Sequence, residues 1–183
     1  MKSRQANFLS DQVRVLEKID TQMIVKTAEL IKRTSHSGKR IWVAGNGGSA
    51  TTASHFATDL SKGCYVETGA RYPTICLNES LGITTAWAND FSYRTALANN
   101  LRSQAASGDC LIAISGSGNS ANIVDLLDTA KNMKISTISF LGFDGGLCKG
   151  KADLEIVIES VDMQIVENCH LYLVHAVYKE ITM

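Results

Sequence analysis

Four side chains that could transfer protons or bind a metal ion stand in two pairs, far apart in the chain. His55 and Asp59 are four residues apart, so on a helix they would share one face. Glu167 and His175 are eight residues apart, which places them about 80° from each other around a helix. His170 lies about 60° from Glu167 on its other side and is an alternative if the register differs. A histidine–aspartate pair alone is also typical of a surface ion pair, so the neighbouring segments must decide between these interpretations.

Two glycine- and serine-rich stretches each follow a short apolar run. The first follows RIWVA at residues 40–44 and contains Gly45, Gly47, Gly48 and Ser49. These glycines allow a tight turn and bring backbone N–H groups close to a ligand, while Ser49 stands where a helix N-cap or a hydroxyl donor is useful. The second stretch, SGSGNS at residues 115–120, follows the apolar run CLIAI in the same manner.

These two stretches predict a binding site for a phosphate group. In an open parallel sheet, ligands bind beyond the carboxyl ends of the strands. A helix N-terminus at that edge stabilises an anion without any lysine. The sequence has neither the G-x-x-x-x-G-K-[ST] pattern of a P-loop nor the glycine spacing of a dinucleotide fingerprint, which favours a small phosphorylated ligand. The alternative, that both stretches are only tight strand-to-helix turns, is weakened because the same device occurs twice.

The elements that must position these residues follow from the apolar periodicity. Helical spacing over residues 8–35 predicts one long helix or two short ones, and residues 161–182 predict a terminal helix. Apolar runs separated by crossover-length segments predict parallel strands at 40–44, 74–78, 110–114, 135–140 and 154–158. Their near-continuous apolarity indicates that helices cover both faces of the sheet. We therefore expect a single α/β domain over residues 1–183: a three-layer αβα sandwich with a five-stranded parallel sheet and an N-terminal helical segment at 1–37.

Charge and composition restrict the partners and the compartment. Lys and Arg number 18, as do Asp and Glu, so we expect neither a nucleic-acid nor a membrane partner. The sequence has no long apolar run and no apolar signal-peptide core at its N-terminus, which predicts a cytoplasmic protein. Its five cysteines are scattered and form no C-x-x-C pair, which favours small buried side chains over metal or redox roles.

Three motifs carry a resemblance to a known family. GNGGSA (45–50), WANDFSY (87–93) and ISGSGNS (114–120) resemble the sugar isomerase (SIS) domains, specifically the phosphoheptose isomerase branch. The resemblance extends from about residue 38 to the end of the chain. It implies an isomerase that converts sedoheptulose 7-phosphate to glycero-manno-heptose 7-phosphate for lipopolysaccharide or capsule heptose biosynthesis. It also implies a homotetramer whose sites are completed across subunits.

The resemblance assigns roles to the four side chains. It implies a zinc site formed by His55, Asp59, Glu167 and His175, in which both histidines match the family. Asp59 stands where the family has glutamate, and Glu167 stands where it has glutamine. Asp59 is the candidate base and His175 the candidate acid or second base. Aspartate is shorter than glutamate by about 1.5 Å, one C–C bond, so Glu167 is kept as an alternative base.

The same resemblance predicts the residues that contact the substrate. Serines and backbone amides would bind the phosphate, whereas asparagine and aspartate side chains would bind sugar hydroxyls. These residues are Asn46, Gly47, Gly48, Ser49, Asn89, Asp90, Ser115, Gly116, Ser117 and Ser120. Isomerisation of another sugar phosphate, sugar-phosphate sensing and a non-catalytic adaptor role like that of the DnaA initiator-associating protein remain alternatives. The acid–base set favours catalysis, because an adaptor has no need of it.

Overall fold

The computed structural model describes residues 4–183. A parallel sheet of five strands, ordered β2-β1-β3-β4-β5, lies at its centre and confirms the predicted fold class. The strands are β1 (Ile41–Ala44), β2 (Thr74–Cys76), β3 (Cys110–Ser115), β4 (Ser136–Gly142) and β5 (Leu154–Ile158). β2 ends at Cys76, before residue 78 of the predicted strand, because the chain turns there and the Glu79 N–H donates to the Cys76 carbonyl at 3.2 Å. The Asn78 side chain in this turn bonds the backbone of Gly45. The Gly45 N–H donates to Asn78 Oδ1 at 3.1 Å, and Asn78 Nδ2 donates to the Gly45 carbonyl at 2.9 Å.

Helices connect the strands and enclose the sheet. They are α1 (Arg4–Leu16), α2 (Thr21–His36), α3 (Gly48–Thr58), α4 (Cys64–Thr68), α5 (Leu81–Asp90), α6 (Tyr93–Gln104), α7 (Ala121–Asn132) and α8 (Met163–Thr182), with a short 3₁₀ turn at Gly146–Cys148. The N-terminal segment therefore forms two helices rather than one. Asp20 starts the second, because its side chain accepts a hydrogen bond from the Gln22 N–H at 2.9 Å.

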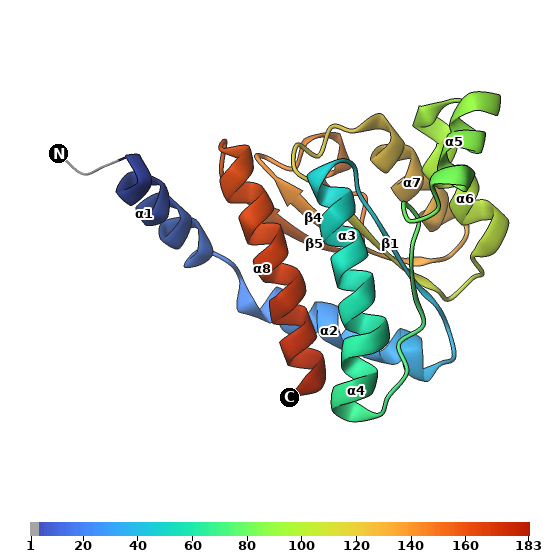
Figure 1. Cartoon of the computed structure of the whole chain (residues 1–183), viewed down its shortest axis with the longest axis horizontal. Coiled ribbons are helices and arrows are strands. Elements are labelled where there is room, and N and C mark those ends of the chain that lie inside the picture. Colours follow the sequence, from blue (N-terminus) through green and yellow to red (C-terminus); the bar gives the residue numbers. More distant parts are fainter. Residues whose placement is uncertain (1–3) are drawn as a thin grey trace.

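Successive side chains of each strand enter two different apolar cores. On β1, Ile41 and Val43 pack with buried residues of α2, α3 and α8, whereas Trp42 and Ala44 pack with residues of α6 and α7. Figure 1 shows α3 and α8 side by side across one face of the sheet. Both faces are thus covered, as the continuous apolar runs predicted. The assignment of all 183 residues to one domain stays a prediction.

Two helices are packed far less than the rest. α1 buries only Val15 of its own residues, and Figure 1 shows it projecting away from the sheet. A cavity of about 1000 Å³ lies between α1, the end of β5 and the start of α8. With residues 4–183 all taken into account, α5 buries none of its residues, and Leu81 and Ile83 on it are exposed. Both helices therefore present apolar side chains that one chain alone does not cover.

The cysteines are unpaired and all five are buried. Burial raises the pKa of the Cys64 and Cys148 thiols to about 11 and that of Cys110 to about 12. Such thiols stay protonated at neutral pH, which agrees with the expected packing role. Within residues 4–183, no helix has the length and apolarity needed to cross a membrane.

Candidate active site

The first glycine loop leads from β1 into α3 through a turn that only glycine can make. A Cβ at Gly45 would lie 2.5 Å from the backbone of Ser49, and Gly47 has a φ of 51°. Gly47 is the N-cap of α3 and makes no side-chain cap bond. The expectation that Ser49 stands at the N-cap position is therefore wrong: Ser49 is the second residue of α3 and is buried.

One helical run carries both His55 and Asp59. α3 continues without a break into a π-helical segment, Asp59–Gly63, and then into α4. Asp59 is the first residue of the π-helical segment, where the backbone N–H of Cys64 bonds the Asp59 carbonyl. Short π-helical insertions of this kind are frequent at functional sites.

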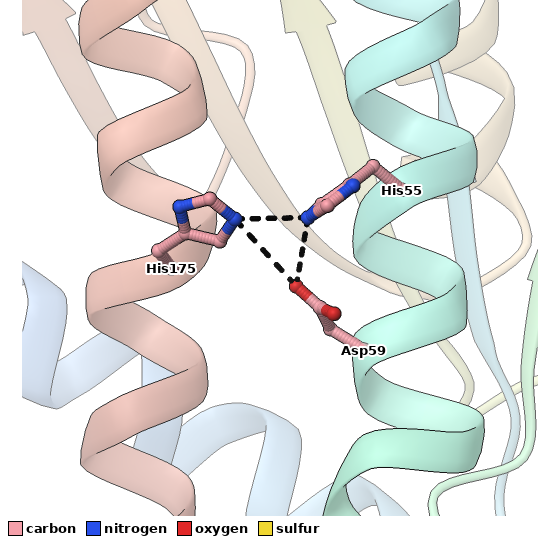
Figure 2. A group of neighbouring side chains, drawn as sticks. All are labelled: His55, Asp59 and His175. Carbon is pink, nitrogen blue, oxygen red and sulfur yellow. Dashed lines mark hydrogen bonds and ion pairs between the residues drawn. The ribbon is translucent and has the colours of Figure 1, made fainter.

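Figure 2 shows His55, Asp59 and His175 pointing toward one another from α3 and α8. His55 Nε2 lies 2.8 Å from His175 Nε2 and 3.2 Å from Asp59 Oδ2. His175 Nε2 lies 4.0 Å from the same Asp59 oxygen. About half of each imidazole and a quarter of the carboxylate are exposed. The group is thus open to a ligand from solvent.

The geometry of these three side chains suits a metal ion. Their ligand atoms all lie within 4.8 Å of one another. Four ligand atoms placed tetrahedrally about 2.05 Å from zinc are separated by about 3.3 Å. The observed separations of 2.8, 3.2 and 4.0 Å lie on both sides of this value. Two imidazoles and one carboxylate are donor types that zinc accepts, with a fourth position left open.

The structure separates Glu167, the fourth predicted ligand, from this group. Its carboxylate lies over the start of α3, where Oε1 is 2.6 Å from the point that a Cβ on Gly48 would occupy. A side chain at Gly48 would displace the Glu167 carboxylate from this position. The pocket that Glu167 enters has a volume of about 150 Å³. Its lining residues are Asn46, Ser49, Ile114, Ser115, Gly116, Ser117, Ser120, Met163 and Glu167.

The second glycine loop forms the opposite wall of this pocket. Ser115 Oγ accepts the N–H of Gly118 at 3.1 Å, and Ser117 Oγ accepts the N–H of Asn119 at 3.2 Å. Ser120 is the N-cap of α7, but its side chain makes no cap bond and faces the pocket. Gly118 has a φ of 65°, and a Cβ there would lie 2.0 Å from the Gly145 carbonyl oxygen. The loop is thus held tightly against the chain that follows β4.

Of the predicted substrate-binding residues, Gly47, Gly48, Asn89 and Asp90 do not line the pocket. Asn89 and Asp90 end α5, are exposed, and bond each other at 3.0 Å rather than lining the pocket. α5 packs against α6 on the outside of the fold, which leaves both side chains directed to solvent within the described chain. His170, the alternative if the helix register differed, is excluded because it is buried beside Phe140.

Sequence reasoning missed two residues that adjoin the site. Tyr93 Oη donates to Asn46 Oδ1 at 2.7 Å, and Asn122 exchanges two hydrogen bonds with the same Asn46 amide. Tyr93 closes the WANDFSY motif and Asn122 follows ISGSGNS by two residues, so proximity to the motifs was the available signal. Spacing alone gave no indication that the three side chains meet.

Known proteins resemble this chain in sequence and in fold. Residues 7–142 match the family model described as "SIS domain". The phosphoheptose isomerase of Trichlorobacter lovleyi is 33% identical over 178 residues, covering 96% of this chain and 90% of that protein. A probable phosphoheptose isomerase of Thermoplasma acidophilum is 32% identical over 170 residues, covering 93% of each.

Solved structures show the same fold. The phosphoheptose isomerase GmhA from Neisseria gonorrhoeae aligns with a TM-score of 0.87 at 28% identity, covering 97% of this chain and 96% of that one. A phosphoheptose isomerase from Francisella tularensis aligns with a TM-score of 0.90 at 22% identity, covering 96% and 95%, and supports the fold alone. The family model matches more than half of this chain, and relatives above 30% identity cover nearly all of it. The chain therefore belongs to the SIS domain family, in its phosphoheptose isomerase branch.

Proposed function

We propose that the chain is an aldose–ketose isomerase that converts sedoheptulose 7-phosphate to glycero-manno-heptose 7-phosphate. The observation that carries this proposal is the convergence of His55, Asp59 and His175 at the end of α3, the helix whose first turn borders the serine-lined pocket. Relatives named phosphoheptose isomerase support the choice of a heptose phosphate. The product would enter heptose biosynthesis for lipopolysaccharide or capsule.

The phosphate group binds in the pocket between the two glycine loops. Ser49, Gly116, Ser117 and Ser120 line it. Gly47 and Gly48 do not line it, but they begin α3 next to it. The N-termini of α3 and α7 both open on this pocket, and their unpaired N–H groups stabilise an anion. This accounts for phosphate binding in a chain of zero net charge.

Proton transfer is assigned to side chains on the two neighbouring helices. Asp59 removes the proton from the carbon next to the sugar carbonyl, and His175 protonates the carbonyl oxygen, which gives an enediol. The reverse transfers at the adjacent carbon and oxygen complete the isomerisation. Because Asp59 is shorter than the glutamate of the family, Glu167 is the alternative base. The π-helical start at Asp59 is where a changed backbone course could offset the shorter side chain.

A zinc ion fits the same group of side chains. His55, Asp59 and His175 would hold it, and Glu167 would be the fourth ligand after its side chain leaves Gly48. When bound, zinc would polarise the sugar oxygen next to the reacting carbon. His55, which has no assigned proton transfer, then serves to bind the ion and to orient Asp59 through their contact at 3.2 Å.

The assembly proposed for the chain is a homotetramer. The support is the exposed apolar surface of α1 and α5, including Phe8, Leu9 and Leu81, which a partner chain would cover. Asn89 and Asp90 end α5 and would reach the sugar of a neighbouring subunit in such an assembly. Five unpaired cysteines are typical of a reducing compartment, so we place the enzyme in the cytoplasm.

A second sugar phosphate is the competing function. Asp59 and Glu167 stand where the family has glutamate and glutamine, and these two substitutions favour a changed substrate. The test incubates zinc-loaded protein with sedoheptulose 7-phosphate, fructose 6-phosphate and ribulose 5-phosphate and follows formation of each aldose phosphate. Turnover of the heptose phosphate alone supports the proposal, and turnover of another ketose phosphate in its place replaces it. If none reacts and the chain instead binds a protein tightly, the adaptor role is the better reading.

A further inference from the structure

A closed group of three polar side chains lies directly behind the pocket. Asn46 Oδ1 accepts two hydrogen bonds, from Tyr93 Oη at 2.7 Å and from Asn122 Nδ2 at 2.8 Å. Asn46 Nδ2 donates one hydrogen to Asn122 Oδ1 at 2.9 Å. Asn122 is buried, so its amide must be satisfied within the protein. The three side chains form what we call the Asn46 network.

The Asn46 network fixes which end of the Asn46 amide a ligand meets. The oxygen already accepts two bonds, and a tyrosine hydroxyl and an asparagine amino group both act as donors to it. The Nδ2 group has two hydrogens, of which Asn122 uses one. Asn46 lines the pocket, and its side-chain amide has one N–H that neither Asn122 nor Tyr93 uses. A ligand atom at this point must therefore be a hydrogen-bond acceptor.

The network also joins three elements that arise far apart in the sequence. Asn46 belongs to the loop after β1, Asn122 to the first turn of α7, and Tyr93 to the start of α6. The two glycine loops that form opposite walls of the pocket are thus linked by paired amides. Neither Tyr93 nor Asn122 lines the pocket itself. Their effect on a ligand must act through Asn46.

We propose that Tyr93 and Asn122 are positioning residues that hold the Asn46 amide so that its free N–H faces an oxygen acceptor of the bound sugar phosphate. This inference rests on the proposed function for the nature of the ligand. The family resemblance assigned no role to Tyr93, the last residue of WANDFSY. The proposal adds that the Tyr93 hydroxyl is needed for substrate binding. A ligand without an acceptor oxygen at that point loses this contact.

The test compares Tyr93→Phe with Tyr65→Phe. The two tyrosine side chains are similarly exposed, at 55% and 53%, but only Tyr93 has a hydrogen bond to the network. In Tyr93→Phe we expect KM and Kd for sedoheptulose 7-phosphate to rise about five-fold, as for the loss of one hydrogen bond. We expect kcat within about two-fold of wild type and an unchanged Tm, because ground-state binding alone is affected. Tyr65→Phe should match the wild type in all four quantities.

A second measurement does not depend on turnover. The side-chain amide signals of Asn46 in a ¹⁵N spectrum, identified by their loss in Asn46→Ser, should shift in Tyr93→Phe and stay in place in Tyr65→Phe. If the wild type turns over sedoheptulose 7-phosphate and Tyr93→Phe keeps its KM, the inference is overturned and the proposed function stands. If the wild type neither binds nor converts that sugar, the proposed function fails. The Asn46 signals then decide the network: a shift in Tyr93→Phe supports it, and an unchanged position overturns it.

Discussion

α8 and α5 both carry predicted site residues, but they differ in how firmly one chain holds them. α8 buries eight of its own side chains between the sheet and α2 and α3, and these flank Glu167 and His175. Within residues 4–183, α5 buries none of its residues. Its last two residues, Asn89 and Asp90, are exposed to solvent. Each buried large apolar side chain contributes about 1.5–3 kcal/mol to the free energy of unfolding.

The difference divides the site into two parts. The part proposed for proton transfer and metal binding is positioned by the core of a single chain, and Figure 2 shows His55, Asp59 and His175 of this part together. The part that would bind sugar hydroxyls through α5 has no such support. A substitution in the first part should affect chemistry in any assembly state, whereas a substitution on α5 should act through assembly.

The largest expected effect comes from the first part. Asp59→Asn keeps the size of the side chain and removes its basicity, so kcat should fall about 1000-fold. Asp125→Asn is a matched control, because the exposed fractions of the two carboxylates are 23% for Asp125 and 24% for Asp59. The measurement is the initial rate of aldose phosphate formation by metal-loaded protein.

Glu167→Gln decides between the two candidate bases. If Glu167 has taken over proton transfer, it is the inactive variant and Asp59→Asn keeps substantial turnover. Full turnover in both variants would show that neither carboxylate is the base. The assigned proton transfers would then be wrong.

A smaller effect should follow from the burial of α8 and appear as pH dependence. Burial lowers the pKa of the His170 imidazole from 6.5 to about 4, although an interaction with the Leu141 backbone opposes the shift. The unfolded chain therefore binds a proton between these pH values that the folded chain does not. Stability is complete above about pH 6.5 and falls by about 3 kcal/mol as the pH decreases toward 4.

The measurement is the free energy of unfolding in urea at several pH values. His170→Leu, which is similar in volume and does not titrate, should lose this part of the pH dependence. His36→Asn, a change at an exposed histidine, should retain it. An identical slope in His170→Leu and the wild type would contradict the assignment.

The smallest effect is expected from α5. Leu81→Lys places a charge on a side chain that is 75% exposed in the single chain, so the fold should remain intact. If α5 is a subunit contact, the particle mass should fall and activity should decrease about ten-fold. Val66→Lys on α4, where the side chain is 68% exposed, is the comparison. Light scattering that reports a single-chain mass for the wild type at micromolar concentration would remove the basis of this prediction.

Much of the fold was predictable because it depends on local pattern. The apolar runs of a parallel sheet are buried on both faces, so the runs ending at Ala44 and Ile114 were readily identified, and β3 extends one residue further than predicted. The sequence did not decide whether residues 8–35 form one helix or two, because apolar periodicity continues through the break between α1 and α2. The capping carboxylate of Asp20, rather than a change in hydrophobicity, starts the second helix.

The site was predictable only to the level of neighbouring elements. The helical spacing of His55 and Asp59 placed both on one face, and their meeting with His175 agrees with that reasoning. The position of Glu167 was not accessible, because it depends on a side-chain rotamer and on the space above Gly48. The bonds of Tyr93 join separate elements, and no spacing rule encodes such contacts. The individual substrate and metal roles stay predictions.

The π-helical segment Asp59–Gly63 also limits how the gene for this protein can change length. A π turn accommodates one more residue than an α turn, so deleting one of residues 60–63 would leave a regular α-helix whose flanking turns keep their register. His55 and Asp59 would then still face α8. A deletion in the regular turns before His55 has no such outlet and would rotate the first glycine loop by about 100° relative to His55. We expect single-residue deletions to be tolerated at residues 60–63 and tolerated poorly at residues 49–54.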